Sequence, residues 1–412
     1  MIIIHAMNDF TYKPRIVEKE LVKALKTFPV VVITGTRQAG KSTLVQHAMK
    51  SRSYLTLDDV DLLEQAQRFP QALIDRAGQV TIDEVQRSPD LLPAVKRAVD
   101  KNRVPGQFVL TGSANLLLMK RISESLAGRA VYFSLMPMTR REIIGRQSAG
   151  IWESFFSLPS DRWMSFIEGQ EPLKENWHDI AQSGGYPVPA LQITDKKERG
   201  LWFAGYAKTY LERDLQDVAD VSSLVDFRRL MRAVCLRLGN VVNQTEIARD
   251  IGMSQPTVMR HLNALETSYQ LIRLPAYGVN RTKRLLKSPK AYWTDTALAM
   301  YLAGESQPRG CHLENIVLSD LMAWGGSVKD AEIMYWRTTT GEEIDFVVEW
   351  NQLLLPVEVK ATANPRLSDA RHLLTFRNEY KKSSLPGLLL YSGDETRWLA
   401  DGVLAAPWWR II

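Results

Sequence analysis

Alternating hydrophobic and polar residues near the C-terminal end of the chain predict a pair of β-strands. In "EEIDFVVEWNQLLLPVEVKAT", residues 342–362, apolar side chains recur at every second position and predict one buried face. A two-residue loop at Asn351 and Gln352 would place Asp345 directly opposite Glu358. Pro356 favours an edge strand or a bulge. The predicted apolar face holds Ile344, Phe346, Val348, Trp350, Leu353, Leu355, Val357 and Val359.

The opposite face of this hairpin carries Asp345, Glu358 and Lys360. Like charges on directly opposed strand positions destabilise the pair by about 0.2–1 kcal/mol. One interpretation is that a cation lies between the two carboxylates. The other is that this face of the sheet is simply exposed to solvent.

A continuous apolar run near the N-terminus, "FPVVVITG", predicts a buried strand that leads into "GTRQAGKST" and the helical stretch "LVQHAMK". This spacing matches the P-loop pattern, in which backbone amides and a helix N-terminus bind phosphates. We expect Lys41 to neutralise the β- and γ-phosphates of ATP and Ser42 to bind Mg²⁺. The predicted nucleotide-binding residues are Gly35, Thr36, Arg37, Gln38, Ala39, Gly40, Lys41, Ser42 and Thr43.

Two further strand ends in this region carry candidate catalytic residues. "QVTIDEVQ" ends a β-type run at Asp83, predicted to hold Mg²⁺, and Glu84, predicted to polarise the attacking water. A third strand, "GQFVLTG", is followed by Ser113 and Asn115, either of which would contact the γ-phosphate or the water. In "SLAGR", Arg129 is a candidate arginine finger for a neighbouring subunit, and the alternative is a solvated side chain.

The middle of the chain has the pattern of a helix-turn-helix followed by a basic hairpin. Helical periodicity runs through "TYLERDLQDVADVSSLVDFRRLMRAVCLRLGNVV", and "NQTEIARDIGMSQPTVMRHLNALE" combines capping residues with a turn at Gly252. Its predicted groove-facing residues are Gln255, Thr257, Arg260 and His261. The next stretch, "RTKRLLKSPK", contains Arg281, Lys283, Arg284, Lys287 and Lys290 without an acid, which favours contact with a DNA backbone. Protein contact is the alternative.

Composition excludes several classes of protein. The chain has 412 residues, of which 45% are hydrophobic and 24% charged, which is ordinary for a soluble globular protein. No apolar run approaches the length of a membrane span, and no secretory signal is evident, so we expect a cytoplasmic protein without a membrane partner. Two cysteines build neither a disulfide framework nor a zinc site. A net charge of +6 is compatible with nucleic acid.

Several ordered motifs resemble one known family. "GTRQAGKST", "TIDEVQ", "LTGSAN", "SLAGR", "SGGYPVPA", "TYLERDL" and "YWTDTALA" are similar to motifs of bacterial and archaeal AAA-type ATPases that carry a DUF4143 region. The resemblance implies an AAA-like ATPase core, a winged-helix-like middle and a restriction-endonuclease-like end. It also singles out Arg213 and Asp214 as an ion pair or as residues that reach a nucleotide across an interface. The tract 145–180 has no clear counterpart and is interpreted as a connector that covers a core, with an interaction surface as the alternative.

The C-terminal carboxylates fit the order of the PD-(D/E)XK nuclease pattern. Glu314 on a predicted helix precedes Asp345, Glu358 and Lys360. In that chemistry the acids bind Mg²⁺ ions that activate water, so a further Mg²⁺ or Mn²⁺ site is expected in this region. The pattern is weak alone, and Lys360 bridging Glu343 or Glu358 is the structural alternative.

Together these patterns predict an α/β protein with a P-loop, AAA-like parallel-sheet ATPase domain (1–145), a helical connector (146–200), a winged-helix region (201–295) and an α/β restriction-endonuclease-like domain (296–412). The predicted function is ATP-driven processing or remodelling of DNA, of the motor or branch-migration type, with or without metal-dependent DNA cleavage. The predicted assembly is a homo-oligomer such as a ring. A nucleotide-switched signalling or defence protein is the alternative.

Overall fold

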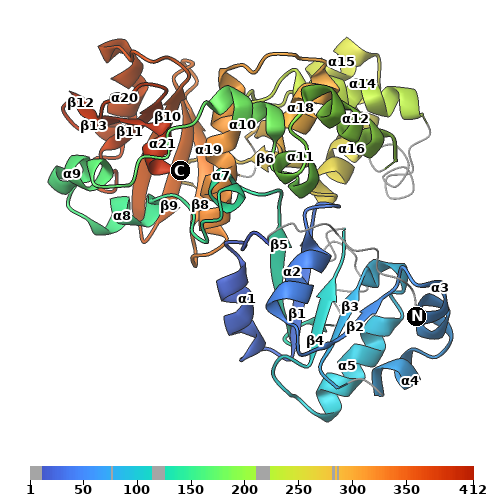
Figure 1. Cartoon of the computed structure of the whole chain (residues 1–412). Helices are drawn as coiled ribbons and strands as arrows, with labels where there is room; N and C mark the ends of the chain where they lie inside the picture. Colours follow the sequence, from blue (N-terminus) through green and yellow to red (C-terminus); the bar gives the residue numbers. More distant parts are fainter. Residues whose placement is uncertain (1–11, 76–77, 114–125, 210–222, 281–283, 285–286) are drawn as a thin grey trace.

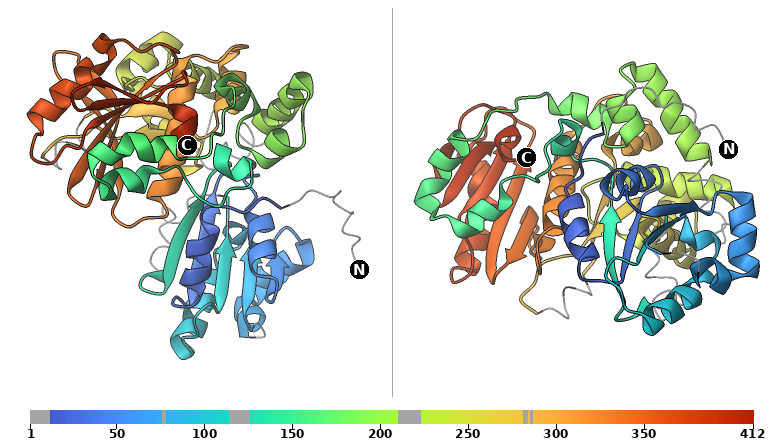
Figure 2. Two further views of the ribbon diagram at one scale, coloured as in Figure 1. Left: turned by 60° about the vertical axis from the view of Figure 1, so that its left-hand side comes forward. Right: turned by 60° about the horizontal axis from the view of Figure 1, so that its bottom comes forward.

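The computed structural model describes residues 12–75, 78–113, 126–209, 223–280, 284 and 287–412 (Figure 1). The described residues between 12 and 135 form a lobe, here called the ATPase lobe, that is set apart from a larger body formed by the described residues between 146 and 412 (Figure 2). Among the described residues, none of the helices combines the length and the apolar character that crossing a membrane requires.

The ATPase lobe is built on a parallel sheet with the strand order β2-β3-β4-β1-β5. Every residue of β1 is buried, as expected for a parallel strand that is covered on both faces. Helices α1 and α2 pack on one face, and α3, α4 and α5 on the other. The strands are β1 (Val30–Gly35), β2 (Ser53–Thr56), β3 (Val80–Asp83), β4 (Phe108–Thr111) and β5 (Ala130–Leu135). The helices are α1 (Glu18–Leu25), α2 (Lys41–Ala48), α3 (Val60–Arg68), α4 (Pro70–Asp75) and α5 (Leu91–Lys101).

The connector covers a core, as predicted, and that core belongs to the body. Trp152 and Trp163 are fully buried there, and Trp152 Nε1 donates to Asp320 Oδ1 at 2.6 Å. The bulk of its aromatic side chains therefore stabilises the C-terminal region. Helix α7 (Arg140–Ile143) precedes the connector, whose helices are α8 (Trp152–Ser157), α9 (Trp163–Glu168), α10 (Trp177–Ser183), α11 (Pro187–Leu191) and the first part of α12 (Lys196–Tyr206).

The two capped helices predicted for the middle of the chain, and the turn between them, are present. Asn243 caps the first helix, Gly252 takes a left-handed conformation (φ 69°) between the two, and Ser254 caps the second. A short antiparallel pair, β6 and β7, follows. The elements are α14 (Leu224–Cys235), α15 (Gln244–Ile251), α16 (Gln255–Thr267), β6 (Leu271–Leu274), β7 (Lys290–Trp293) and α18 (Thr296–Ala303).

The C-terminal region contains a mixed sheet with the strand order β12-β13-β11-β10-β9-β8. Residues of helix α19 pack in the core on one face, and residues of α20 pack in the core on the other. Both faces are therefore covered, and the interpretation of a solvent-exposed polar face is wrong. The elements are α19 (Gly310–Gly325), β8 (Glu332–Arg337), β9 (Glu343–Trp350), β10 (Leu353–Lys360), α20 (Arg371–Glu379), β11 (Gly387–Tyr391), β12 (Arg397–Ala400), β13 (Val403–Pro407) and α21 (Trp408–Ile411).

The predicted register of the β9–β10 hairpin is confirmed. Pairing runs from Leu353 with Trp350 to Val357 with Phe346, and both loop residues have positive φ, as a type I′ turn requires. Two details differ from the prediction. Strand β10 is interior despite its proline. A register shift between β8 and β9 moves Ile344 into the core with α20, whereas Phe346 packs in the core with α19.

Candidate nucleotide-binding site

The P-loop begins where β1 meets β5. Gly35 has φ 138°, and a Cβ atom there would lie 1.9 Å from the carbonyl oxygen of Leu135, so only glycine fits. The loop continues through two more positive-φ residues, Gln38 and Gly40, and helix α2 begins at Lys41. A strand, a loop of this kind and a helix N-terminus form the phosphate-binding arrangement that the sequence predicts.

Lys41 is folded into the loop. Its Nζ donates to the carbonyl oxygens of Gly35 at 3.2 Å and Thr36 at 2.8 Å. Burial lowers the pKa of Lys41 to about 8, while the nearby carboxylates of Glu84 and Asp83 oppose this change. The Thr36 hydroxyl is buried beside it without a hydrogen-bond partner. A buried ammonium group and an unsatisfied hydroxyl in one loop fit the phosphate oxygens of a nucleotide.

Ser42 and Asp83 lie together, as the sequence predicts for a Mg²⁺ site. Ser42 Oγ donates to Asp83 Oδ2 at 2.8 Å. Asp83 also accepts hydrogen bonds from the hydroxyls of Tyr54, at 2.5 Å, and Thr111. The hydroxyl and carboxylate oxygens are the hard ligands that Mg²⁺ takes alongside phosphate. Sequence reasoning missed Tyr54 and Thr111, although a polar residue at the end of the buried strand β4 was the available indication for Thr111.

Glu84 follows β3 directly and has a left-handed backbone (φ 57°), which is unusual outside glycine and common at functional sites. Burial raises the pKa of Glu84, and the Lys41 charge opposes the rise. Gln86 donates both to Glu84 and to Ser113 Oγ, the latter at 3.1 Å. The structure thus brings Glu84 and Ser113 together through Gln86, which sequence reasoning missed. Asn115 lies outside the described residues.

Arg129 lies just before β5, at the amino ends of the parallel strands. It forms an ion pair with Asp100 at 2.6 Å, and its carbonyl accepts from Val30, the first residue of β1. Because the strands are parallel, the P-loop lies at their carboxyl ends, and Arg129 is therefore remote from it. Arg129 therefore does not serve the nucleotide site of its own chain, and its action on a neighbouring subunit stays a prediction.

A buried arginine that the sequence did not single out, Arg15, is hydrogen-bonded to the backbone of the P-loop. Arg15 Nη1 donates to the carbonyl of Ala39 at 2.8 Å, and Nη2 donates to that of Met136 at 2.7 Å. Its Nε lies 3.1 Å from Glu142. Arg15 thereby ties the loop to the segment that leaves the ATPase lobe.

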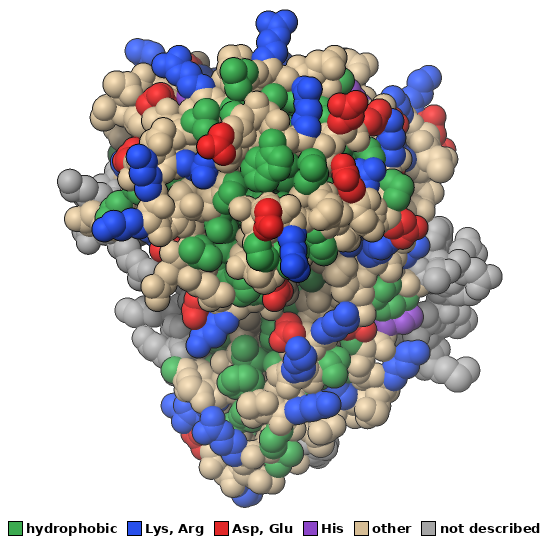
Figure 3. Space-filling model, turned by 90° about the vertical axis from the view of Figure 1, so that its left-hand side faces the viewer, with side chains coloured by type: hydrophobic (Ala, Val, Ile, Leu, Met, Phe, Trp, Pro, Cys, Tyr) green, Lys and Arg blue, Asp and Glu red, His purple; other side chains and the backbone are tan. Residues whose placement is uncertain are grey.

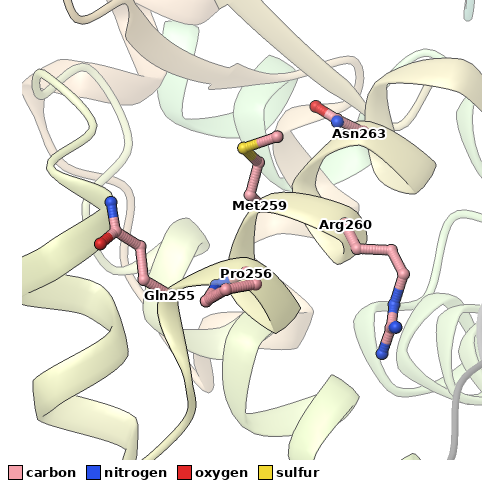
Figure 4. Close-up of a pocket in the computed structure, with 5 residues that line it drawn as sticks. All are labelled: Gln255, Pro256, Met259, Arg260 and Asn263. Carbon is pink, nitrogen blue, oxygen red and sulfur yellow. The ribbon is translucent and has the colours of Figure 1, made fainter.

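Helix α16 keeps part of its predicted exposed face. Gln255, Pro256, Met259, Arg260 and Asn263 line a shallow pocket on it (Figure 4). Thr257 is half-buried and its hydroxyl lies 2.8 Å from that of Ser254. The prediction for His261 is wrong: it is 2% exposed and packs edge-on against Phe227.

Two cations of the basic stretch after β6, Arg284 and Lys290, are turned inward. Arg284, 8% exposed, pairs with Glu332 at 2.9 Å and Glu349 at 2.8 Å and lies over the ring of Tyr277. Lys290, 1% exposed, is also paired with acids. The prediction that these two cations face DNA is wrong, because acids from β8 and β9 neutralise them. Lys287 is exposed, and Arg281, Lys283, Arg213 and Asp214 lie outside the described residues.

Lys290 enters the C-terminal carboxylate cluster. Its Nζ lies 2.5 Å from Glu343 Oε1 and 3.2 Å from Asp345 Oδ1. Burial alone would lower the pKa of Lys290, but the charges of Asp345, Glu343 and Glu314 outweigh it and raise the pKa. Burial also raises the pKa of Glu314 to about 8, and the Asp345 charge adds to this. A cation does lie among these carboxylates, and it is a lysine from β7.

The rest of the cluster is satisfied by protein groups. Lys360 Nζ donates to Glu358 Oε1 at 2.6 Å, Tyr292 donates to Glu314 at 3.0 Å, and the Val359 amide donates to Asp345 at 3.0 Å. Within the described part of the chain, no group of three or more His, Cys, Asp or Glu residues is arranged to hold a metal ion. The cluster does not fit the further Mg²⁺ or Mn²⁺ site. Lys360 instead pairs with Glu358, which is the structural alternative given above for this lysine.

Known proteins match the chain in three consecutive segments. Family profiles cover residues 27–144 (AAA domain), 174–309 (domain of unknown function DUF8612) and 309–411 (domain of unknown function DUF4143). The AAA match and the P-loop geometry together identify a P-loop ATPase, a class of enzyme that in general uses ATP and Mg²⁺.

Relatives span almost the whole chain. An uncharacterized protein of Mycobacterium tuberculosis is 31% identical over 94% of this chain and 82% of its own length. An uncharacterized protein of Haemophilus influenzae is 22% identical over 90% of this chain and 92% of its own length. The Walker-type ATPase of Pyrococcus abyssi aligns with 71% of this chain and 99% of its own, at 15% identity and a TM-score of 0.43. RuvB of Thermotoga maritima aligns with 71% of this chain and 95% of its own, at 18% identity and a TM-score of 0.29. Both likenesses are too partial to indicate a substrate. The chain belongs to the family of AAA-type P-loop ATPases that carry a C-terminal DUF4143 region.

Proposed function

We propose that this ATPase acts on double-stranded DNA bound along helix α16, and that it works as a homo-oligomer. The observation that carries the proposal is the exposed face of α16, where Gln255, Arg260 and Asn263 project from the second helix of a capped helix pair. Amide and guanidinium side chains on the exposed face of such a helix are the groups that contact base edges and phosphates.

The charge available for this contact is smaller than the sequence suggests, because Arg284 and Lys290 are neutralised internally. On the face drawn in Figure 3, which lies on the side of the C-terminal sheet and away from α16, basic and acidic side chains are interspersed with hydrophobic ones. Binding would therefore rest on few phosphate contacts, and we expect modest affinity with a shallow dependence on salt.

In this proposal Lys41 and Ser42 hold the nucleotide and Mg²⁺, Glu84 acts as the catalytic base, and Arg129 completes the site of a neighbouring subunit. The carboxylate cluster around Asp345 serves as a scaffold and not as a nuclease centre, because lysines already compensate its charge. The fold would thus remodel or move DNA without cutting it.

The experiment measures duplex DNA binding by fluorescence anisotropy at several salt concentrations, together with steady-state ATP hydrolysis. Arg260→Ala should weaken binding and reduce the slope of log affinity against log salt by about 1. Lys329→Ala removes one positive charge at a highly exposed turn of the C-terminal region and is the matched control. Equal effects of the two variants would refute the assignment of α16.

A second candidate function is a nucleotide-operated switch that binds a protein partner. The inward-turned Arg284 and Lys290 favour it, because they remove charge that a DNA-binding hairpin would need. A switch would hydrolyse ATP at the same rate with and without DNA, whereas the proposed function requires stimulation.

A further inference from the structure

Helix α16 ends in an unusual way. The Tyr269 amide donates to the carbonyl of Glu266 at 3.0 Å, and the Gln270 amide donates to that of Leu265 at 2.8 Å, which closes the helix. Tyr269 takes the left-handed conformation (φ 60°) that such a helix end demands. Glycine or asparagine normally fills this position, and a bulky aromatic residue there is a genuine outlier. Something other than backbone preference must favour tyrosine.

The side chain of Tyr269 reaches the ATPase lobe. Its hydroxyl lies 2.6 Å from Thr34 Oγ1 in a buried contact, and Ser134 Oγ of β5 lies 3.5 Å away. Thr34 is the residue immediately before Gly35, the first residue of the P-loop. The end of α16 is therefore hydrogen-bonded to the strand from which the P-loop emerges.

The next residue makes a second connection to the same loop. Gln270 Nε2 donates to the Tyr206 hydroxyl at 3.2 Å, and that hydroxyl lies 3.3 Å from the carbonyl of Arg37. The Tyr186 hydroxyl lies 3.0 Å from that of Tyr206 and supports it. Two of the residues that follow α16 thus reach the start of the P-loop: Tyr269 contacts Thr34 directly before it, and Gln270 reaches Arg37 through Tyr206.

These polar contacts run between hydrophobic cores that form distinct clusters among the described residues. The ATPase lobe buries its own clusters on the two faces of its sheet, and the body has a cluster that includes α16. Buried hydrogen bonds are directional and costly to leave unmade, so a shift of the loop must either move α16 or break them. Lys41 now rests on the carbonyls of Gly35 and Thr36, and bound phosphates would compete for it.

We propose that Tyr269 is a positioning residue that couples the P-loop to helix α16, so that nucleotide binding changes the stability of α16. Coupling between two sites is reciprocal, so whatever binds α16 changes nucleotide affinity by the same factor. The second half of this inference rests on the proposed function, because it takes duplex DNA as the α16 ligand. The first half does not.

The test is amide hydrogen exchange over residues 255–267 in the full-length protein, with and without Mg²⁺ and a non-hydrolysable ATP analogue. In the wild type, the analogue should change exchange in this helix about fivefold or more. Tyr269→Phe keeps the ring and removes the hydroxyl, and Tyr269→Asn also relieves the backbone. Both should still bind the analogue and lose most of the response in α16.

Tyr301→Phe on α18 makes the same chemical change outside the described contacts of the P-loop and should keep the full response. The inference is overturned if either Tyr269 variant that folds keeps the wild-type response, or if the wild type shows none. A parallel titration with duplex DNA tests reciprocity: nucleotide should shift DNA affinity in the wild type and not in Tyr269→Phe. Absence of DNA binding in every variant would remove the proposed function, while the exchange data would still decide the coupling.

Discussion

Replacing Lys290 with methionine should destabilise the body severely. The substitution keeps the length of the side chain and removes the cation that faces Glu343 and Asp345. Lys290 is 1% exposed and Asp345 is 8% exposed, so water cannot replace the lost charge without opening the core. The remaining carboxylates would then be buried without their counter-ion.

The magnitude follows from the geometry. At the 3.2 Å that separates Lys290 Nζ from Asp345 Oδ1, and with an effective dielectric constant of about 20, the attraction is about 5 kcal/mol. Removal of the lysine also removes its own desolvation cost, which reduces the loss. Breaking a buried ion pair by removing one partner typically costs about 3–5 kcal/mol, and we expect a loss in that range.

Urea unfolding followed by tryptophan fluorescence measures this loss in the right part of the molecule. The 11 tryptophans all lie at or after residue 152, so the signal comes from the body alone. Urea is uncharged and does not screen the ion pairs. Lys287→Met removes an exposed charge three residues earlier and should change the free energy of unfolding by less than about 0.5 kcal/mol.

A double variant separates electrostatics from packing. Lys290→Met with Asp345→Asn removes both charges and keeps an oxygen that accepts from Val359, so it should recover part of the lost stability. A loss for Lys290→Met no larger than that of the Lys287 control, or a double variant that recovers nothing, would refute the view that Lys290 is the counter-ion of this cluster.

Three further predictions concern the two clusters of carboxylates and the P-loop. Glu84→Gln should bind ATP normally and hydrolyse it about 10²–10⁴-fold more slowly in a phosphate-release assay; unchanged hydrolysis would exclude Glu84 as the base. Gly35→Ala should abolish binding of a fluorescent ATP analogue, because the added Cβ meets the Leu135 carbonyl at 1.9 Å, while the tryptophan-monitored unfolding of the body stays at the wild-type value. The pKa of Glu314 is about 8 in the folded protein and near 4.5 when unfolded, so its carboxyl ionises on unfolding between these values and stability falls as pH rises through that window. Glu314→Gln should reduce the difference between the free energies of unfolding measured by urea titration at pH 5 and at pH 8.5. A difference equal to that of the wild type would contradict the raised pKa of Glu314.

Sequence reasoning succeeded where the determining contacts are local. The P-loop is defined by the spacing of Gly35, Gly40 and Lys41, and its backbone requirements are met within a few residues. The β9–β10 register follows from alternation and a two-residue loop, so it was predictable although Asn-Gln is a rare turn. Helix caps at Asn243 and Ser254 are likewise local.

Sequence reasoning failed where the charge of a side chain is neutralised by residues from a distant part of the chain. Arg284 and Lys290 stand in a run without acids, but the acids that pair with them are 48 or more residues away in sequence. His261 has the spacing of a groove-facing residue, yet its burial depends on how α14 packs against α16. The shift of Ile344 depends on pairing with β8, which the hairpin alone does not reveal.

The continuous core of the body has a consequence for dividing this protein into pieces. Trp293 of β7 exchanges two backbone hydrogen bonds with the side chain of Asn315 on α19, at 3.1 and 2.8 Å. The helix pair and one face of the C-terminal sheet bury their apolar residues in one cluster. A cut between residues 295 and 296 would expose the interior of both fragments. We therefore expect a protease to release the ATPase lobe as a separate fragment and to leave the body whole, so that its helix pair and its sheet can be exchanged among relatives only together.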